Sequence, residues 1–391
     1  MKPDELMEEA GLLKTVYSFV MPETESLIDE VLGSVSHRQA LRDRHREAWT
    51  GKQDYYHDEF FSSWLRWVNP AASFRGLKRA SRRRFFRYPT AGSSEGIREV
   101  IAQHASLSNY RPAHGVPVLH VLAGEYEGYS AYAESYGMRV VEHEGREAWQ
   151  ITESIEASLE HMGVDGTGHL FFISQPSSID GMLRDNNHIL DIFEWLQENT
   201  GVRVAVDLCY VGTFGEHATE KRGRVAFDLY DGPCEVVDYI CFSLSKVFGL
   251  YYHRIGGIFS RKEMPGLYGN KWFKNLTSLY LACEFMRRYS VFELPDRYAG
   301  IQTQAIDKIK AELMAGSDAE HDGGGFNPKP ADVFLLANER ISNDNWKNPI
   351  PQRFLRGTSA TGSARYCLTK KMHEIATAEG LYTELKGDED A

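Results

Sequence analysis

The sequence predicts an α/β protein whose large domain has three layers, with a mostly parallel sheet between helices, and which also carries a small α+β domain. Between residues 88 and 290, short apolar runs alternate with amphipathic helical patterns. This alternation is typical of parallel strands joined by crossover helices. The chain has 391 residues, which is more than one compact core usually holds. We therefore expect two lobes that share a cleft.

The elements of the large domain follow from their patterns. The run HLFFIS is continuously apolar, as expected for a strand buried on both faces. The segment LRDNNHILDIFEWLQENTG places Ile189, Ile192, Phe193 and Leu196 on one helical face, and Gly201 ends it. The same reasoning predicts strands at 117–123, 169–174, 202–207 and 236–245, and further helices after the loop at 88–94 and over 127–137.

Three segments are expected along the chain. Residues 1–85 are charged and mostly helical, and we assign them to part of the small domain and to an arm at a dimer interface. Residues 86–295 form the large domain. Residues 296–391 form the C-terminal small domain, in which a glycine-rich loop leads into an expected strand, ADVFLLA (331–337).

Composition excludes several classes of protein. The net charge of −11 argues against general binding of nucleic acid. No stretch approaches the roughly 18 apolar residues of a membrane span, and the acidic N-terminus has no signal-peptide pattern. The cysteines are odd in number and lack CxxC spacing, which argues against disulfides and structural zinc and favours the cytoplasm. They are Cys209, Cys234, Cys241, Cys283 and Cys367.

One segment is strongly basic. The run RGLKRASRRRFFR is interpreted as a solvated face or an arm on a partner subunit. The alternative interpretation is the mouth of a site for an anionic substrate. Its basic residues are Arg75, Lys78, Arg79, Arg82, Arg83, Arg84 and Arg87.

Polar residues gather where ligands bind in parallel α/β sheets, at the carboxyl ends of strands. Gly92, Ser93 and Ser94 precede an expected helix, and the free N–H groups at a helix N-terminus favour a phosphate. Arg254 could add a charge-assisted contact to the same anion. We expect a phosphate site here, although the serines could also simply cap the helix.

Two strand ends supply the remaining chemistry. Lys246 follows the strand that ends in SLS, and Asp207 and Tyr210 follow VRVAVD. An aldehyde cofactor with a phosphate and a basic ring nitrogen needs such a set. Lys246 would form the Schiff base, Asp207 would keep the ring nitrogen protonated, and Tyr210 could bond the ring oxygen. An aromatic residue from AGEYEGY could stack on the ring.

These motifs resemble the fold-type I pyridoxal-phosphate enzymes, in particular the class I/II aminotransferases. The family has S-x-S/A-K with an arginine eight residues later, matched here by Ser243, Lys246 and Arg254. Its D-x-x-Y is matched by Asp207 and Tyr210. The resemblance covers residues 86–300 and implies an aspartate-aminotransferase-like large domain that binds pyridoxal 5'-phosphate.

Further positions match less closely. The loop Gly92–Ser94 fits the family's G-S-S phosphate loop, and Tyr126 best fits the ring-stacking aromatic. The family's N-P-x-N-P-T-G is replaced by QPSSIDG at 175–181, which puts Ser178 in place of the asparagine that contacts the ring oxygen. The family's substrate-carboxylate arginine is best matched by Arg365 in SARYCLT, with Arg356 as the alternative.

The resemblance implies a pyridoxal-phosphate-dependent aminotransferase that acts on an amino acid through the Lys246 Schiff base, in specialised biosynthesis. The altered QPSSIDG loop motivates an alternative with the same cofactor: elimination or replacement at the β- or γ-carbon, or carbon–carbon bond formation, on a bulky or phosphorylated substrate. A regulator without turnover is disfavoured, because the first 85 residues show no clear helix-turn-helix.

The family also implies a homodimer with a shared active site, and an amino-acid or amine substrate. Tyr55 or Tyr56 in the N-terminal segment is a candidate to reach across to the partner subunit. No metal is expected, and the histidines are interpreted as structural or surface residues.

Overall fold

The large domain is built on a seven-stranded sheet with the strand order β1-β7-β6-β5-β4-β2-β3. The computed structural model describes residues 7–8, 10–68, 85–108, 116–215, 237–250, 253–270, 275–316, 326–341, 349–357 and 362–382. The pairings from β3 through β6 are parallel, and β7 is antiparallel to both β6 and β1. The strands are β1 Phe86–Thr90, β2 Val118–Leu122, β3 Arg139–His143, β4 Leu170–Ser174, β5 Arg203–Leu208, β6 Tyr239–Ser243 and β7 Gly256–Ser260.

The prediction of a mostly parallel α/β sheet is confirmed. The four expected strands are β2, β4, β5 and β6. Strands β1, β3 and β7 were not predicted. Proline and glycine interrupt FRYPT and GGIFS, and β3 is an edge strand with partly exposed side chains. These features weaken the apolar run that marks a buried strand.

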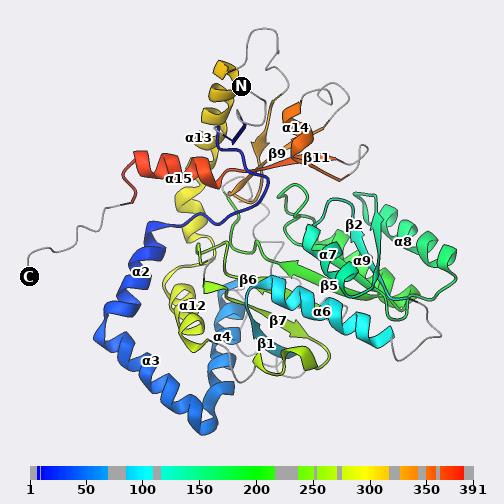
Figure 1. Cartoon of the computed structure of the whole chain (residues 1–391), viewed down its shortest axis with the longest axis horizontal. Coiled ribbons are helices and arrows are strands. Elements are labelled where there is room, and N and C mark those ends of the chain that lie inside the picture. The colour runs from blue at the N-terminus through cyan, green and yellow to red at the C-terminus, as the bar shows by residue number, and fades with distance from the viewer. Residues whose placement is uncertain are drawn as a thin grey trace, which may run out of the picture.

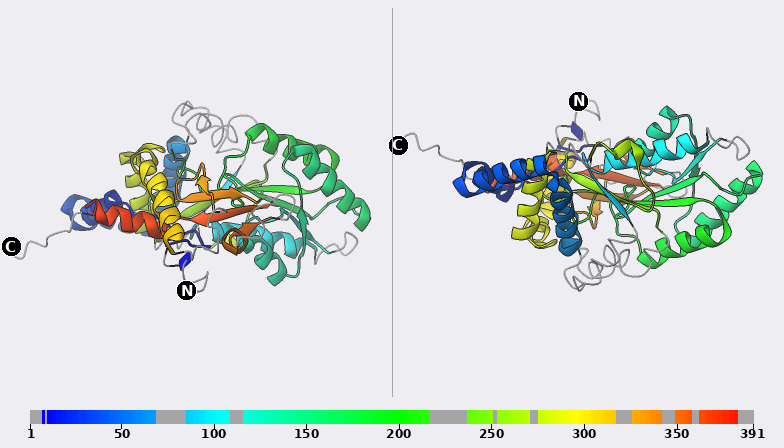
Figure 2. Two further views of the ribbon diagram at one scale, coloured as in Figure 1. Left: turned by 90° about the horizontal axis from the view of Figure 1, so that it is seen from above. Right: turned by 90° about the horizontal axis from the view of Figure 1, so that it is seen from below.

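Helices cover both faces of this sheet, as Figure 2 shows. On one face, α6 (Ser93–Ser108) and α7 (Glu127–Ser135) pack on alternate side chains of the strands. On the other face lie α8 (Ala148–Met162) and α9 (Asn186–Asn199). A capping box at Glu147 starts α8, and Gly163, with a φ of 66°, ends it.

The N-terminal helices lie beside the large domain, and the last of them packs against the sheet. They are α2 (Pro22–Gly33), α3 (Val35–Glu47) and α4 (Gln53–Val68), and a π-helical turn at Ala48–Lys52 joins the last two. Helix α4 lies beside α12 (Leu276–Arg288), as Figure 1 shows. Trp64 of α4 stacks on Phe242 of β6, with ring centroids 4.0 Å apart. The expected helical character of this segment is confirmed where the structure describes it.

The small domain contains a four-stranded antiparallel sheet in the order β10-β11-β9-β8. Its elements are α13 Glu293–Gly316, β8 Lys329–Pro330, β9 Leu336–Arg340, α14 Pro349–Arg353, β10 Leu355–Arg356, β11 Ser363–Cys367 and α15 Thr369–Ala378. Helix α13 runs without a break across residues 295 and 296, where we predict a domain boundary. The two domain boundaries stay predictions.

The expected strand at 331–337 is wrong in position, because the observed strand β9 begins at Leu336. Most of the apolar run instead forms a buried turn between β8 and β9. The side-chain amide of Gln302 donates to the carbonyls of Ala331 and Leu336, at 3.0 and 2.7 Å. The turn can therefore be buried without unsatisfied carbonyls at these positions.

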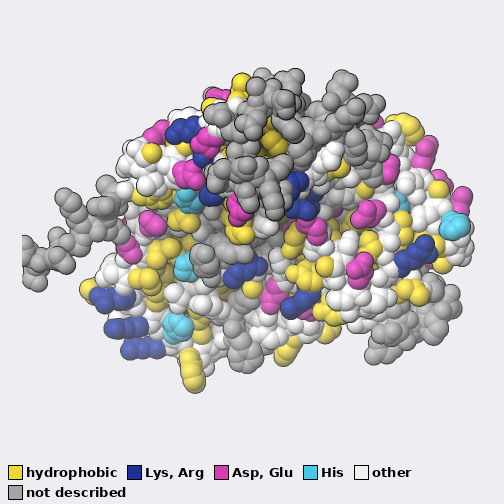
Figure 3. All heavy atoms as spheres, turned by 45° about the horizontal axis from the view of Figure 1, so that its top comes forward, with side chains coloured by type: hydrophobic (Ala, Val, Ile, Leu, Met, Phe, Trp, Pro, Cys, Tyr) yellow, Lys and Arg dark blue, Asp and Glu magenta, His cyan; other side chains and the backbone are white. Residues whose placement is uncertain are grey.

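The basic residues fall into two groups. Arg75 to Arg84 lie outside the described residues, whereas Arg87 pairs with Asp58 at 2.8 Å. Figure 3 shows Lys and Arg side chains gathered at the edge of the molecule where α3 lies.

Within the described ranges, no helix has both the length and the apolar character that crossing a bilayer requires. The cytoplasmic location stays a prediction.

We expect Trp64→Ala to lower the free energy of unfolding by about 3–5 kcal/mol, because it leaves a cavity against Phe242. Trp49→Ala is the matched control, since Trp49 is 91% exposed and Trp64 only 1%. Urea unfolding of both variants measures the difference. Equal losses would contradict the packing role of Trp64.

Candidate active site

A cavity of about 500 Å³ lies at the carboxyl ends of β5 and β6 and beneath the small domain. It gathers segments from the whole chain, including the N-terminal residues 14–16. Every predicted site residue lines it except Gly92, which adjoins it through Ser93. The lining residues are Lys14, Thr15, Val16, Ser93, Ser94, Tyr126, Glu127, Ser178, Asp207, Cys209, Tyr210, Ser243, Ser245, Lys246, Arg254, Arg356 and Arg365.

Lys246 lies in the turn that follows β6, largely removed from solvent. Its Nζ donates a hydrogen bond to the carbonyl of Val16, in the N-terminal segment. Burial lowers the pKa of the Lys246 amine. A lysine with a lowered pKa supplies more of the neutral amine that attacks an aldehyde. The position therefore suits a nucleophile.

Asp207 lies near the end of β5, and its side chain is buried. The Tyr129 hydroxyl donates to Oδ2 at 3.1 Å. No described residue offers a hydrogen bond of good geometry to Oδ1. Burial raises the pKa of Asp207 to about 7, although the bond from Tyr129 acts in the opposite direction. A buried carboxylate oxygen without a partner fits a protonated ring nitrogen of a cofactor.

The loop before α6 fits a phosphate. Gly92 has a φ of 80°, and a Cβ there would lie 3.2 Å from Arg254 Nη2 and 3.4 Å from Ser243 Oγ. Only glycine brings the backbone this close to the arginine without strain. Arg254 itself donates to the carbonyl of Ala91 at 2.8 Å. The guanidinium and the N-terminus of α6 thus face the same small volume.

The register of the sheet explains why Arg254 lies close to Gly92. Gly256 of β7 pairs with Thr90 of β1 on one side and with Ser243 of β6 on the other. Arg254, two residues before Gly256, is therefore carried to the loop at Gly92. Sequence reasoning found the pair from the motif, although it did not predict β1 or β7.

Two tyrosines line the cavity. Tyr126 directly precedes α7, and its ring lies edge-on to Tyr129, with centroids 5.4 Å apart. A Cβ on Gly128 would lie 2.2 Å from the Tyr126 ring, so glycine at 128 leaves the room that the ring occupies. Tyr210 is buried in the cavity wall, and burial raises the pKa of its hydroxyl.

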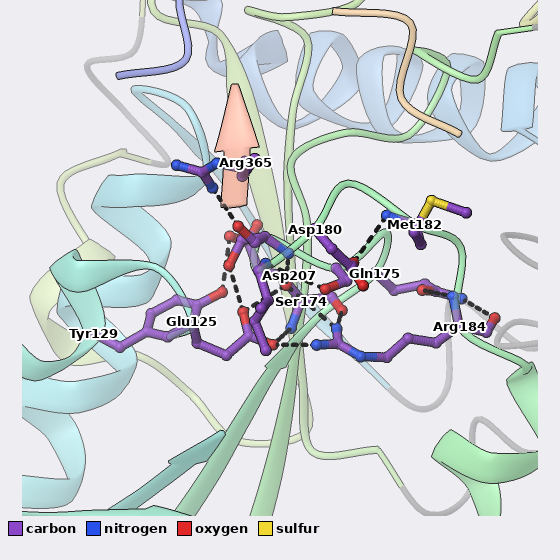
Figure 4. A network of polar contacts seen from close by, with 12 residues as sticks. Glu125, Tyr129, Ser174, Gln175, Asp180, Met182, Arg184, Asp207 and Arg365 are labelled. Atoms are coloured by element: carbon purple, nitrogen blue, oxygen red, sulfur yellow. Dashed lines mark hydrogen bonds and ion pairs between the residues drawn. The ribbon is translucent and has the colours of Figure 1, made fainter. Parts of the chain in front are cut away.

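Ser178 differs in its contacts from what the sequence suggests. It lines the cavity, but its hydroxyl donates to Oε2 of Glu125. Glu125 also forms an ion pair with Arg184 at 2.8 Å. Figure 4 shows Glu125 and Arg184 within this network of polar contacts. The Ser178 hydroxyl therefore donates its proton within the protein. Its predicted contact with the cofactor ring stays a prediction.

The two candidate substrate arginines both reach the cavity. Arg365 Nη1 donates to the carbonyl of Ser178, and Arg365 Nε has no partner among the described residues. Arg356 forms an ion pair with Glu127. Burial lowers the pKa of Arg356. Arg365 therefore offers a donor for a ligand, whereas the charge of Arg356 is already matched by Glu127.

The comparisons with known proteins agree with this geometry. Residues 115–291 match the family model of aminotransferase class I and II. The aminotransferases are pyridoxal-phosphate-dependent transferases, so the enzyme class and the cofactor predicted from the sequence are confirmed. No curated protein sequence matches the chain significantly.

Solved structures share the fold of this protein. A probable N-succinyldiaminopimelate aminotransferase from Thermus thermophilus is 16% identical, with 97% of both chains covered and a TM-score of 0.59. Histidinol-phosphate aminotransferase from Sinorhizobium meliloti, in complex with pyridoxal-5'-phosphate, is 15% identical, with 97% and 95% covered and a TM-score of 0.54. A C-S lyase from Staphylococcus hominis is 11% identical, with 84% and 82% covered and a TM-score of 0.54. These identities show the fold and not the reaction.

Sequence reasoning missed some residues of the candidate site. Glu125 and Glu127 flank the predicted Tyr126, and both contact predicted site residues. A signal for Glu125 existed, since it lies three residues after the buried strand β2, and an acidic residue that is buried there requires a partner. Residues 14–16 carried no such signal. Among the described residues, no group of His, Cys, Asp and Glu could hold a metal ion.

The raised pKa of Asp207 predicts how the stability of the cofactor-free protein depends on pH. The folded pKa is about 7 and the ordinary value 3.8, so between them the folded state binds more protons. The free energy of unfolding should fall as pH rises through this range, by at most about 1.4 kcal/mol per pH unit. Urea unfolding of wild type and Asp207→Asn at several pH values tests this. Identical pH slopes would show that Asp207 does not titrate there.

Proposed function

We propose that the protein is an aminotransferase that moves the amino group of an amino acid to a 2-oxo acid, with Lys246 covalently linked to the cofactor aldehyde. The observation that carries the proposal is the arrangement of three groups at one cavity. The cavity joins the Lys246 amine and the buried Oδ1 of Asp207, and the Gly92–Ser94 loop lies beside Arg254 at its edge. These three features match the aldehyde, the ring nitrogen and the phosphate of pyridoxal phosphate.

When bound, the cofactor supplies the electron sink for a carbanion at the substrate α-carbon. Asp207 pairs with the ring nitrogen and keeps it protonated. Arg254 and the N-terminus of α6 hold the phosphate and so fix the ring. Tyr126 lies at the cavity wall, where it can cover one ring face.

In this proposal Lys246 also acts as the general base and acid of the reaction. Its Nζ takes a proton from the α-carbon of the substrate and returns one to the cofactor carbon. A general base works best when its pKa lies near the working pH. The burial that lowers the pKa of Lys246 acts in this direction. The Val16 carbonyl, which accepts a hydrogen bond from Nζ, holds the amine at the cavity wall.

Arg365 binds the substrate α-carboxylate in this proposal. Its buried guanidinium has a fixed place at the Ser178 carbonyl and retains the Nε donor. Arg356 and Glu127 lie in the same cavity and face the rest of the substrate. An amino acid enters with its carboxylate toward Arg365 and its amine toward Lys246.

A second reaction class has support from one observation. The hydroxyl of Ser178 donates to Glu125, whereas the aligned family position carries an asparagine. A changed contact at the cofactor ring could favour elimination or replacement at the β- or γ-carbon, or carbon–carbon bond formation. A C-S lyase shares the fold at 11% identity. We keep transfer as the proposal because the rest of the site requires nothing beyond it.

We also propose a homodimer, as is typical of the family. Tyr56 is buried in its own subunit, where its hydroxyl donates to Glu47, whereas Tyr55 is 64% exposed. Of the two predicted tyrosines, Tyr55 is therefore free to contact a partner. Sedimentation of the active enzyme as a monomer would contradict the dimer.

The reaction is tested with Lys246→Ala. We expect the wild-type protein with cofactor to absorb visible light. Reduction with borohydride should trap the cofactor on Lys246, as a mass increase at this residue. The enzyme should also form amino product in stoichiometric amount from a 2-oxo acid. The variant should lose all three, because Lys246 supplies the amine that bonds to the aldehyde. Lys14→Ala is the control, since Lys14 lines the same cavity. A keto product without amino product would favour elimination.

A further inference from the structure

A buried ion pair lies directly behind the wall of the active site. Glu125 follows β2, and its side chain is 1% exposed, whereas that of Arg184 is 17% exposed. Arg184 Nη2 contacts Glu125 Oε1 at 2.8 Å. Neither residue lines the cavity. The proposed reaction therefore makes no direct use of this pair.

The pair is bonded to the loop at 175–181. Oε2 of Glu125 accepts from the Ser174 hydroxyl at 2.6 Å and from the Ser178 hydroxyl. The Ser174 hydroxyl in turn accepts from the backbone N–H of Ser178 at 2.7 Å. Arg184 also donates to the Ser174 carbonyl. Side chain and backbone of Ser178 are thus both fixed by this one ion pair.

Ser178 also contacts Arg365, the arginine proposed to bind the substrate carboxylate. Its carbonyl accepts from Arg365 Nη1, and Arg365 Nη2 donates over a longer distance, 3.5 Å, to the Lys14 carbonyl. Figure 4 shows Arg365 above the network and Arg184 at its side. Arg184, Glu125, Ser178 and Arg365 therefore form one continuous chain of polar contacts.

We propose that Arg184 and Glu125 are positioning residues for the substrate carboxylate: they fix Ser178, and its carbonyl fixes the guanidinium of Arg365 at the cavity wall. This inference rests on the proposed role of Arg365. Charge-assisted hydrogen bonds are short and directional. Removing one charge of a buried pair leaves the other uncompensated, so the contacts around it rearrange.

We expect variants of this ion pair to change the binding of the substrate carboxylate more than the rate of the chemical step. A shift of the 175–181 loop moves the Ser178 carbonyl, and small misplacements of a binding group cost large factors in rate or affinity. Lys246 and Arg254 lie between β6 and β7, on other segments of the chain than this ion pair. Cofactor binding should therefore be spared.

The test uses Glu125→Gln in the cofactor-loaded enzyme. Propionate and 3-phenylpropionate carry the carboxylate without the amine, and their dissociation constants follow from the shift of cofactor absorbance on titration. We expect Glu125→Gln to weaken both by about tenfold and to raise KM while kcat changes by about twofold or less. Arg365→Leu should weaken them at least as much. Cofactor affinity should stay at the wild-type value in Glu125→Gln.

Two further variants separate positioning from general damage. Asp238→Asn is the control, because Asp238 pairs with Arg203 at 3.1 Å next to β6, remote from the cavity lining. It should leave carboxylate affinity unchanged. Ser174→Ala removes one hydroxyl from the network and nothing from the cavity, and it should weaken binding even if Glu125→Gln fails to fold.

The outcomes distinguish the two proposals. Weakened carboxylate binding in Arg365→Leu, with wild-type binding in Glu125→Gln and Ser174→Ala, overturns the positioning role and leaves the role of Arg365 intact. Wild-type binding in Arg365→Leu, or no binding by the wild-type enzyme, overturns the role of Arg365 and with it this inference. Neither result touches the Lys246 experiment.

Discussion

The buried carboxylate of Asp207 is the constraint on which the site depends. An ionised carboxylate in an apolar interior needs a cation or several donors. Tyr129 supplies one hydrogen bond, which leaves the pKa raised to about 7. Buried titratable groups with a shifted pKa are common at functional sites. In the proposed function, the partner of Asp207 is the protonated ring nitrogen of the cofactor.

The sheet brings the other groups to this carboxylate. Asp207 pairs in register with Ser174 of β4 and Cys241 of β6. The turn with Lys246 follows one neighbour, and the loop with Ser178 follows the other. Side chains distant in sequence thus meet because parallel strands end at one edge. The antiparallel β7 adds Arg254 from the opposite direction.

Much of this arrangement could be predicted from the sequence, for a physical reason. Lys246, Asp207 and Arg254 stand in short motifs beside strong apolar strands, where residue type and spacing carry the information. Glu125 and the N-terminal residues 14–16 could not be placed, because their contacts lie across the fold. The short strands β1 and β7 were hidden by proline and glycine, and the ADVFLLA run was misplaced because Gln302 stabilises a turn there.

The contact between Lys246 and Val16 has a consequence for how the molecule folds. The two residues are 230 positions apart, and Arg365 lies 351 positions from its acceptor at Lys14. Closing such loops is slow compared with forming helices or neighbouring strands. The cavity is therefore complete only when the N-terminal segment and the small domain have both met the sheet. A cofactor that binds only the completed cavity shifts the equilibrium toward the fully folded chain.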